Sequence, residues 1–447
     1  MNTGPLWLKC LPVSLRRPFQ ERPELLAIAH NAGWLFADKT LRMFVGVVVG
    51  AWVARYLGPS QFGEMAYVLS FVALFGAVAQ LGLDGVAVRD IARQKSEAPQ
   101  ILGTVLRLRL LAGLLAWASA IGLMAVLRPG DLQTLLLTAV AAATLSLQAA
   151  DTVDLWFQSQ TQSRRTVMAK GYAYLAANGL KVTLILAQAP LLAFVLLTVV
   201  ELAFSAAVLW WQYRKYPADS AWTWSPQRAG TLLRESFPYL VAGIAVLVYM
   251  RIDQIMIRSL VGEYELGLYS AMLPLSSALH FVPMALCISI SPSLSRMRQQ
   301  EPARYQQSVA RLFSIMWWVM IPLAAAVSVL SGTIVGLLYG PAYAAAAPML
   351  ALHVFSAVPV ALGVAQSIWI VNEGRHHMSF YRTAIGAVCN ILLNLLLIPR
   401  YGGTGAAAAA VAAQTAAAVL SNLVLAPAMF RLQFAALVNL RSPVPLK

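Results

Sequence analysis

Charged side chains are scarce in this chain. Only 11% of its 447 residues are Asp, Glu, Lys or Arg, whereas hydrophobic residues make up 59%. A soluble domain carries about 25% charged residues. Because a chain of this size needs such charge to cover its surface with polar groups, the composition excludes an ordinary soluble protein. The apolar surface that remains is expected to face lipid.

Other features that are absent narrow the possible functions. The chain has 3 cysteines, and their spacing matches neither a metal site nor a disulfide framework. It has no Gly-x-x-x-x-Gly-Lys-Ser/Thr motif, which argues against direct ATP hydrolysis. Residues 1–30 lack the uninterrupted apolar core of a secretory signal. We therefore expect no metal ion, no cofactor and no cleaved leader.

Long apolar runs dominate what is present. A transmembrane helix needs about 20 consecutive, mostly apolar residues. Runs of this kind occur at 31–54, 62–83, 102–127, 132–154, 168–188, 190–211, 236–258, 266–290, 311–337, 345–370, 379–398 and 404–430. The predicted fold class is therefore an all-α integral membrane protein with about twelve transmembrane helices.

The positive charges support this topology. The formal net charge is +15, but the 33 Lys and Arg residues stand singly between apolar runs and form no stripe that would bind nucleic acid. Most of them fall in every second loop, as the positive-inside rule requires. Both termini are then predicted to be cytoplasmic. The loops of the opposite side hold Arg55, Arg128, Arg258 and Arg400.

A short repeat divides the chain near its middle. Gly58 to Gly63 reads GPSQFG after the first run, and Gly262 to Gly267 reads GEYELG after the seventh. Parallel repeats of about six spans occur in several transporter folds. We therefore expect a cytoplasmic tail at 1–30, an N-terminal lobe at 31–211, a cytoplasmic loop at 212–235, a C-terminal lobe at 236–430 and a cytoplasmic tail at 431–447.

Four segments, read in order, resemble a known family. They are ARYLGPSQFG (54–63), GLDGVAVRDIAR (82–93), RIDQIMIRSLVGEYELGLYSA (251–271) and LLIPRYGGTGAAAA (396–409). Together they are similar to the Wzx-type polysaccharide flippases, whose superfamily, MATE/MOP, also holds multidrug and toxin extrusion antiporters and lipid II flippases. The resemblance covers about residues 30–430.

The resemblance implies two six-helix lobes around a cationic cavity. It implies transport, without enzyme activity, of oligosaccharide repeat units linked to undecaprenyl pyrophosphate across the bacterial inner membrane, for O-antigen, capsule or exopolysaccharide export. A polysaccharide polymerase and a chain-length regulator are the partners it suggests. Two alternatives stay open: a cation-coupled drug or metabolite antiporter of the same superfamily, and an integral-membrane polysaccharide polymerase or ligase.

Ionisable residues within the apolar runs are the candidate site, because a charge in hydrocarbon costs several kcal/mol. Lys39, Arg42, Lys181 and Arg251 are expected to line the cavity and contact the anionic substrate. Candidates for ion coupling are Asp38, Glu201, Asp253 and His280.

Structural roles compete with these functional ones. Asp38 and Arg42 are four residues apart and can neutralise each other. Lys181 and Glu201 are expected at similar depth on neighbouring helices, where they would form an ion pair. Arg107 and Arg109 stand near the inner end of the third run, and snorkelling to the interface explains them.

Overall fold

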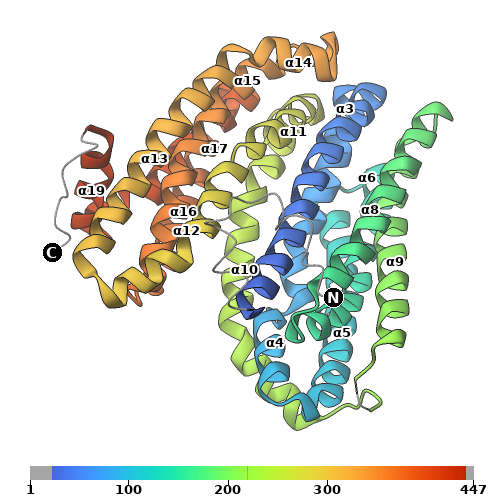
Figure 1. Ribbon diagram of the computed structural model, residues 1–447. Coiled ribbons are helices and arrows are strands. Elements are labelled where there is room, and N and C mark those ends of the chain that lie inside the picture. Colours follow the sequence, from blue (N-terminus) through green and yellow to red (C-terminus); the bar gives the residue numbers. More distant parts are fainter. Residues whose placement is uncertain (1–22, 219, 439–447) are drawn as a thin grey trace, which may run out of the picture. The chain divides into compact units, whose positions relative to one another are not determined.

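The protein is described by a computed structural model. It defines the backbone of residues 23–218 and 220–438, and the side chains of 39–162, 164–218 and 220–437. All regular structure in these ranges is helical (Figure 1). The contacts between residues divide the chain into two compact units. Unit 1 comprises residues up to Gly46 together with Phe75–Leu240, and unit 2 comprises Val47–Leu74 together with Val241–Lys447.

The helices account for the twelve expected spans. In the described part of the chain, nine segments are long and apolar enough to cross a membrane. Two of these are broken by a glycine with positive φ, Gly58 (71°) and Gly402 (58°), so each consists of two helices. A further helix, α8 (Ser163–Leu186), has 24 residues but is less apolar than the nine. The orientation of the termini stays a prediction.

The bounds of several helices differ from those of the predicted runs. The ninth run was placed at 311–337, but its helix α13 covers Pro302–Val329 and a separate helix α14 covers Ser331–Tyr339. A run defined by apolar residues cannot show where a helix begins outside the lipid. The twelfth run, 404–430, is interrupted at Ala426, where the backbone leaves helical geometry.

Unit 1 is a bundle of helices in which both consecutive helices and the pair α6 and α9 pack as neighbours. α5 packs on α6, α6 packs on α9, and α8 packs on α9 (Figure 1). Its core contains buried apolar side chains such as Phe157, Leu102 and Ile91. Unit 1 contains both ends of α3 (Pro23–Gln80) and the start of α10 (Pro226–Leu260). Its other elements are α4 (Asp84–Arg93), η1 (Lys95–Glu97), α5 (Ala98–Leu127), α6 (Leu132–Leu147), η2 (Gln148–Asp151), α7 (Thr152–Ser159), α8 and α9 (Leu191–Lys215).

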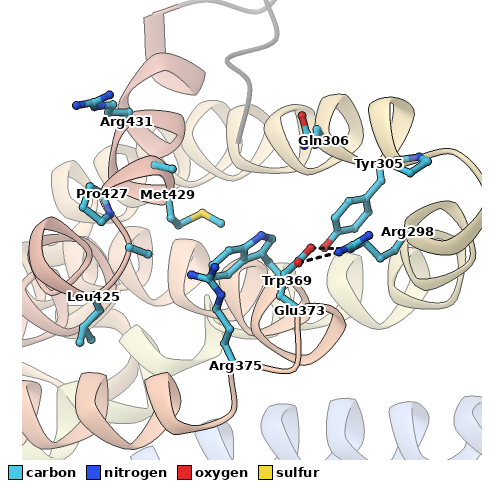
Figure 2. A pocket seen from close by; sticks show the side chains of 13 residues that line it. Arg298, Tyr305, Gln306, Trp369, Glu373, Arg375, Leu425, Pro427, Met429 and Arg431 are labelled. Atoms are coloured by element: carbon cyan, nitrogen blue, oxygen red, sulfur yellow. Dashed lines mark hydrogen bonds and ion pairs between the residues drawn. The ribbon is translucent and has the colours of Figure 1, made fainter. Parts of the chain in front are cut away.

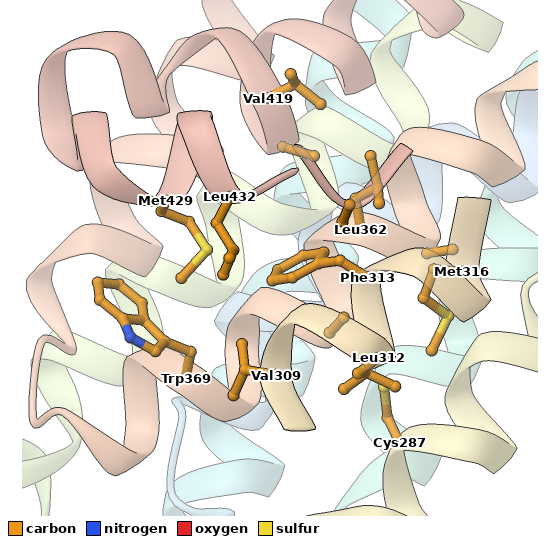
Figure 3. Packing of buried hydrophobic residues seen from close by; sticks show 14 of the residues in the cluster. Cys287, Val309, Leu312, Phe313, Met316, Leu362, Trp369, Val419, Met429 and Leu432 are labelled. Carbon is orange, nitrogen blue, oxygen red and sulfur yellow. The ribbon is translucent and has the colours of Figure 1, made fainter. Parts of the chain in front are cut away.

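Unit 2 packs α13 against α16 and α19, around a core that contains Phe313, Leu362 and Met429 (Figure 3). Unit 2 contains the middle of α3 and the rest of α10. Its other elements are α11 (Glu263–Ala278), α12 (Phe281–Gln300), α13, α14, η3 (Pro341–Tyr343), α15 (Ala346–His353), η4 (Val354–Ser356), α16 (Ala357–Asn372), α17 (His377–Thr415), the π-helical turn η5 (Ala416–Leu420), α18 (Asn422–Leu425) and α19 (Pro427–Val438).

The two glycine turns on which the predicted repeat is based have similar backbone geometry within unit 2. Gly58 has φ 71° and ψ 168°, and Gly262 has φ 105° and ψ 178°; L side chains rarely adopt such φ values. The two turns also touch. A Cβ on Gly63 would lie 1.9 Å from the carbonyl oxygen of Glu263, and a Cβ on Gly267 would lie 1.9 Å from that of Pro59. The repeats therefore cross with their backbones in reciprocal contact.

Many large apolar side chains lie on the surface of the helices. Leu115, Val126, Leu186 and Val424 are 69%, 76%, 79% and 84% exposed. Scattered apolar residues are normal on soluble proteins, but extended apolar surfaces of this kind are not. The exposure supports the lipid-facing surface inferred from composition.

Candidate functional site

One spanning helix of unit 1 carries a polar face. α8 presents Lys170, Tyr174, Asn178 and Lys181, which are spaced by four, four and three residues. Residues three or four apart share one side of a helix, so these four side chains lie on a single face. The same polar residues lower the hydropathy of α8 below that of the other spans.

Arg42 of α3 lies against this face. Its guanidinium carbon is 4.8 Å from the centre of the Tyr174 ring, which is the geometry of a cation–π contact. The Tyr174 hydroxyl donates a hydrogen bond of 2.9 Å to the Arg42 carbonyl oxygen. Gly46 permits this approach, because a Cβ there would lie 2.8 Å from the Tyr174 hydroxyl. The contacts hold Arg42 beside α8.

The expected pairing of Lys181 with Glu201 is present but long. Lys181 Nζ lies 4.0 Å from Glu201 Oε2, and the two side chains keep 23% and 26% of their surface exposed. Lys181 Nζ also donates to Asn178 Oδ1 at 3.5 Å. The depth argument from the sequence therefore brought the right residues together, yet the distance leaves room for either partner to engage another group.

Lys170 is neutralised much more tightly. Its Nζ lies 2.7 Å from Asp151 Oδ1 and 2.8 Å from Asp154 Oδ2. These carboxylates come from η2 and α7, where the helix that begins as α6 is interrupted. Lys170 thus fastens α8 to this interruption and contributes little net positive charge.

A cavity of about 320 Å³ brings these groups together in unit 1. It holds two cations, Arg42 and Lys170, and two carboxylates, Asp151 and Glu201. Lys170 is held by two carboxylates, whereas Arg42 stacks on Tyr174 and Glu201 contacts Lys181 only at 4.0 Å. The remaining lining residues are Thr144, Ala173, Thr198, Leu202 and Ser205.

Asp253 of unit 2 lies in a different environment. It is 8% exposed, and its carboxylate accepts hydrogen bonds from the Tyr269 hydroxyl and from the backbone N–H of Gln254. The adjacent Gln254 side chain in turn accepts a hydrogen bond from Ser70. Arg251 is half-buried on the same helix, α10. The structure therefore encloses Asp253 in a network of neutral donors.

The remaining candidates are dispersed. His280 joins α11 to α12, and its Nε2 is buried without a hydrogen-bond partner among the described residues. The Tyr269 ring, which belongs to the hydrogen-bond network of Asp253, also contacts the ring of His353. His353 Nδ1 lies 2.7 Å from Ser276 Oγ. Lys39 is exposed one turn before Arg42. The Asp38 side chain lies outside the described residues, so its expected pairing with Arg42 stays a prediction.

The snorkelling expected for Arg109 is wrong. Its side chain is 1% exposed and its guanidinium forms an ion pair with Asp84 of α4. Arg107, two residues earlier, lies over Trp224 with 5.9 Å between the guanidinium carbon and the ring centre. The Arg109 guanidinium is therefore buried and reaches Asp84, whose own side chain is 57% exposed, whereas the sequence suggested that Arg109 itself would extend to the interface.

Sequence reasoning missed the contribution of Lys170, Tyr174 and Asn178. Lys170 lies near the start of its span, where the positive-inside rule predicts a cytoplasmic charge, and Tyr174 and Asn178 carry no charge. Their helical spacing within a membrane span was the signal that could have found them. Among the described residues, no three His, Cys, Asp or Glu side chains are placed to hold a metal ion.

The profile of a family described as polysaccharide biosynthesis protein matches residues 52–348, more than half of the chain. No curated protein is a significant match to the sequence.

Solved structures share the fold at low sequence identity. An inward-closed lipid II flippase, MurJ, is 14% identical, with a TM-score of 0.68 and 91% of both chains covered. An inward-facing multidrug resistance MATE transporter of the MOP superfamily is 13% identical, with a TM-score of 0.68, covering 88% of this chain and 95% of its own. A MOP superfamily transporter from Pyrococcus furiosus is 13% identical, with a TM-score of 0.57 and coverage of 93% and 96%. The fold is that of MOP superfamily transporters.

Proposed function

Because the chain belongs to the polysaccharide biosynthesis protein family and is a membrane transporter rather than an enzyme, we propose that it is a flippase for lipid-linked oligosaccharides. The substrate would be a repeat unit on undecaprenyl pyrophosphate, moved by alternating access between the leaflets of the bacterial inner membrane. A polymerase and a chain-length regulator would act on the product.

The observation that carries this proposal is the position of Arg42. Its guanidinium lines a polar cavity among spanning helices of unit 1, fixed by the ring of Tyr174. Arginine is well suited to phosphate because its planar group donates two parallel hydrogen bonds. Lys39, one turn away, Lys181 and Arg251 are proposed as further contacts to the pyrophosphate.

Glu201 is proposed to couple transport to an ion. It lines the same cavity as Arg42, it is partly exposed, and its ionic contact with Lys181 is long. A proton or Na⁺ arriving at Glu201 would release Lys181 toward the substrate, which links ion occupancy to anion binding. Asp38, Asp253 and His280 stay as secondary candidates for this role.

The cation-coupled antiporter is retained as a second candidate for one reason. Asp151 and Glu201 line the cavity together with the cations, so the lining is of mixed charge rather than purely positive. A cationic substrate would engage these carboxylates in place of Arg42. The two functions therefore predict opposite consequences for removal of the Arg42 charge.

The test uses the full chain in proteoliposomes that carry lipid-linked oligosaccharide on one leaflet. The appearance of the sugar on the other leaflet is followed with a membrane-impermeant reagent. We expect the protein to accelerate this transfer and Arg42→Gln to slow it roughly tenfold or more, since a charge-assisted contact is lost. Arg214→Gln is the matched control, because Arg214 is exposed in the last turn of α9 and lies outside the cavity.

The outcome also decides between the two candidates. If the wild-type protein transfers no lipid-linked sugar but exports a cationic dye under a proton gradient, and Arg42→Gln leaves that export intact, the flippase proposal is rejected.

A further inference from the structure

A second cavity, of about 640 Å³, lies at one end of unit 2 (Figure 2). Its walls are the end of α12, the start of α13, the end of α16 and the junction of α18 with α19. The charge pattern of the sequence predicts this end to be cytoplasmic. No residue of this cavity belongs to the candidate site of unit 1.

The cavity forms where the helical backbone is interrupted after α18 and resumes as α19. Ala426 has φ −158°, and Pro427 begins the new helix. α19 is held from behind: Trp317 Nε1 donates to the Gln433 carbonyl oxygen at 2.9 Å, and Ser314 Oγ donates to that of Ala436 at 2.8 Å. The wall that α19 provides is therefore fixed by hydrogen bonds and packing, and the cavity is part of the fold.

The cavity lining carries a net positive charge, because it contains three arginines and one carboxylate, Glu373. Arg298 donates two hydrogen bonds, of 2.7 and 3.0 Å, to the two oxygens of Glu373 (Figure 2). This bidentate pair neutralises Glu373. Two cations remain, Arg375 after α16 and Arg431 on α19, and both are exposed.

Arg375 is already oriented at the cavity. Its guanidinium carbon lies 5.2 Å from the centre of the Trp369 ring. A guanidinium that rests on an aromatic face keeps its N–H groups at the edge available to an acceptor. Among the described residues no carboxylate pairs with Arg375, so it can donate to an anionic oxygen directly.

Apart from Tyr305 and Gln306 of α13, the uncharged part of the lining is mostly apolar. Leu425, Pro427 and Met429 form one side, and Met429 also packs into the core of unit 2 (Figure 3). A free, fully hydrated anion gains nothing from such a wall, whereas a phosphate attached to glycerol and acyl chains does. Basic pockets between spanning helices at the cytoplasmic side fit lipid head groups.

We propose that this cavity binds the phosphodiester head group of an anionic phospholipid from the surrounding leaflet. Arg375 and Arg431 contact the phosphate, and the acyl chains leave along Leu425 and Met429. The inference does not depend on what the protein transports, since it concerns a resident lipid outside the candidate transport site.

The experiment compares lipid retention by three full-length proteins. Wild type, the double variant Arg375→Gln/Arg431→Gln and the control Arg304→Gln are purified in detergent, and phosphatidylglycerol or phosphatidylcholine is titrated while bound lipid is counted by native mass spectrometry. Arg304 is a matched control because it lies on α13 near the same end, is 63% exposed, pairs with Glu301 and does not line the cavity.

We expect saturable retention of phosphatidylglycerol by the wild-type protein and by Arg304→Gln, and binding roughly tenfold weaker in the double variant. Phosphatidylcholine, which is zwitterionic, should not saturate the site. Inorganic phosphate and glycerol 3-phosphate form a third arm, read from the thermal unfolding midpoint.

Three results would overturn the proposal. Equal retention of phosphatidylglycerol by the double variant and wild type would show that the two arginines do not form the site. Equal retention of both lipids would remove the role of charge. Stabilisation by inorganic phosphate as strong as that by the lipid, lost in the double variant, would assign the cavity to a soluble phosphate instead.

Discussion

Ionisable residues occur in the membrane spans of both units, but their surroundings differ. In unit 1, Arg42 and Glu201 line a cavity, and the Lys181–Glu201 pair is long and about one-quarter exposed. In unit 2, Asp253 is 8% exposed and accepts hydrogen bonds from Tyr269 and Gln254. Charged residues in a span thus serve two purposes: those that face a cavity can change partners, and those enclosed by donors hold helices together.

The largest effect on stability is expected in unit 2. Asp253→Ala leaves the buried Tyr269 hydroxyl without its acceptor, which should lower the free energy of unfolding by about 1–3 kcal/mol. Thermal unfolding in detergent measures this. Removing both partners in Asp253→Ala/Tyr269→Phe should recover much of the loss, because neither polar group is then left unsatisfied.

Asp253→Asn sharpens the comparison, since the amide keeps an acceptor oxygen for Tyr269. We expect it to unfold close to the wild-type midpoint and to transport normally. A stable Asp253→Asn protein whose transport no longer responds to a proton or Na⁺ gradient would instead place the coupling ion in unit 2.

A smaller effect is expected for the pair in unit 1. Lys181→Ala and Glu201→Ala should each cost about 1 kcal/mol, below the roughly 3–5 kcal/mol of a fully buried pair, because both side chains are partly exposed. The double alanine variant and the charge swap Lys181→Glu/Glu201→Lys should restore stability. Double-mutant cycles of thermal unfolding give the coupling energy directly.

Glu201→Gln separates structure from coupling at the same position. It should cost no more stability than Glu201→Ala, because the side chain keeps its shape and polarity, and it should flatten the dependence of transport on the ion gradient. A dependence on the gradient equal to that of wild type would reject the coupling role of Glu201. Single alanine variants as stable as wild type, with a charge swap that restores neither stability nor transport, would reject the pairing.

The smallest effect is expected at Lys39. Its side chain is exposed, so Lys39→Gln should change the free energy of unfolding by less than about 0.5 kcal/mol. If it contacts the pyrophosphate, the variant should nevertheless slow the sugar-transfer assay, and less than Arg42→Gln does. A transfer rate equal to wild type would confine the anion contact to the cavity itself.

The sequence predicts most of the fold because a spanning helix leaves a strong local signal of length and apolarity. α8 is the instructive case: the run 168–188 was recognised although Lys170 and Asn178 make the helix less apolar than the other spans. The repeat at Gly58 and Gly262 was also readable, since a positive φ favours glycine in both copies.

The candidate site was predicted less completely, because helix depth can be read from a sequence and rotation about the helix axis cannot. Depth alone paired Lys181 with Glu201. The rotation that brings Arg42 onto Tyr174, or buries Arg109 beside Asp84, depends on tertiary packing. For the same reason the carboxylates that hold Lys170 were not foreseen.

The crossing of the two glycine turns has a consequence for biogenesis. Val47–Leu74 is synthesised early, but it packs in unit 2 with Val241–Lys447. At about 5–20 residues per second, synthesis from Gly63 to Gly267 takes on the order of 10–40 s. During that interval this hairpin resides in the bilayer before the backbone it will touch has been made. Unit 2 therefore cannot mature in the order of translation, and its first segment must be retained in the membrane while most of unit 1 is synthesised.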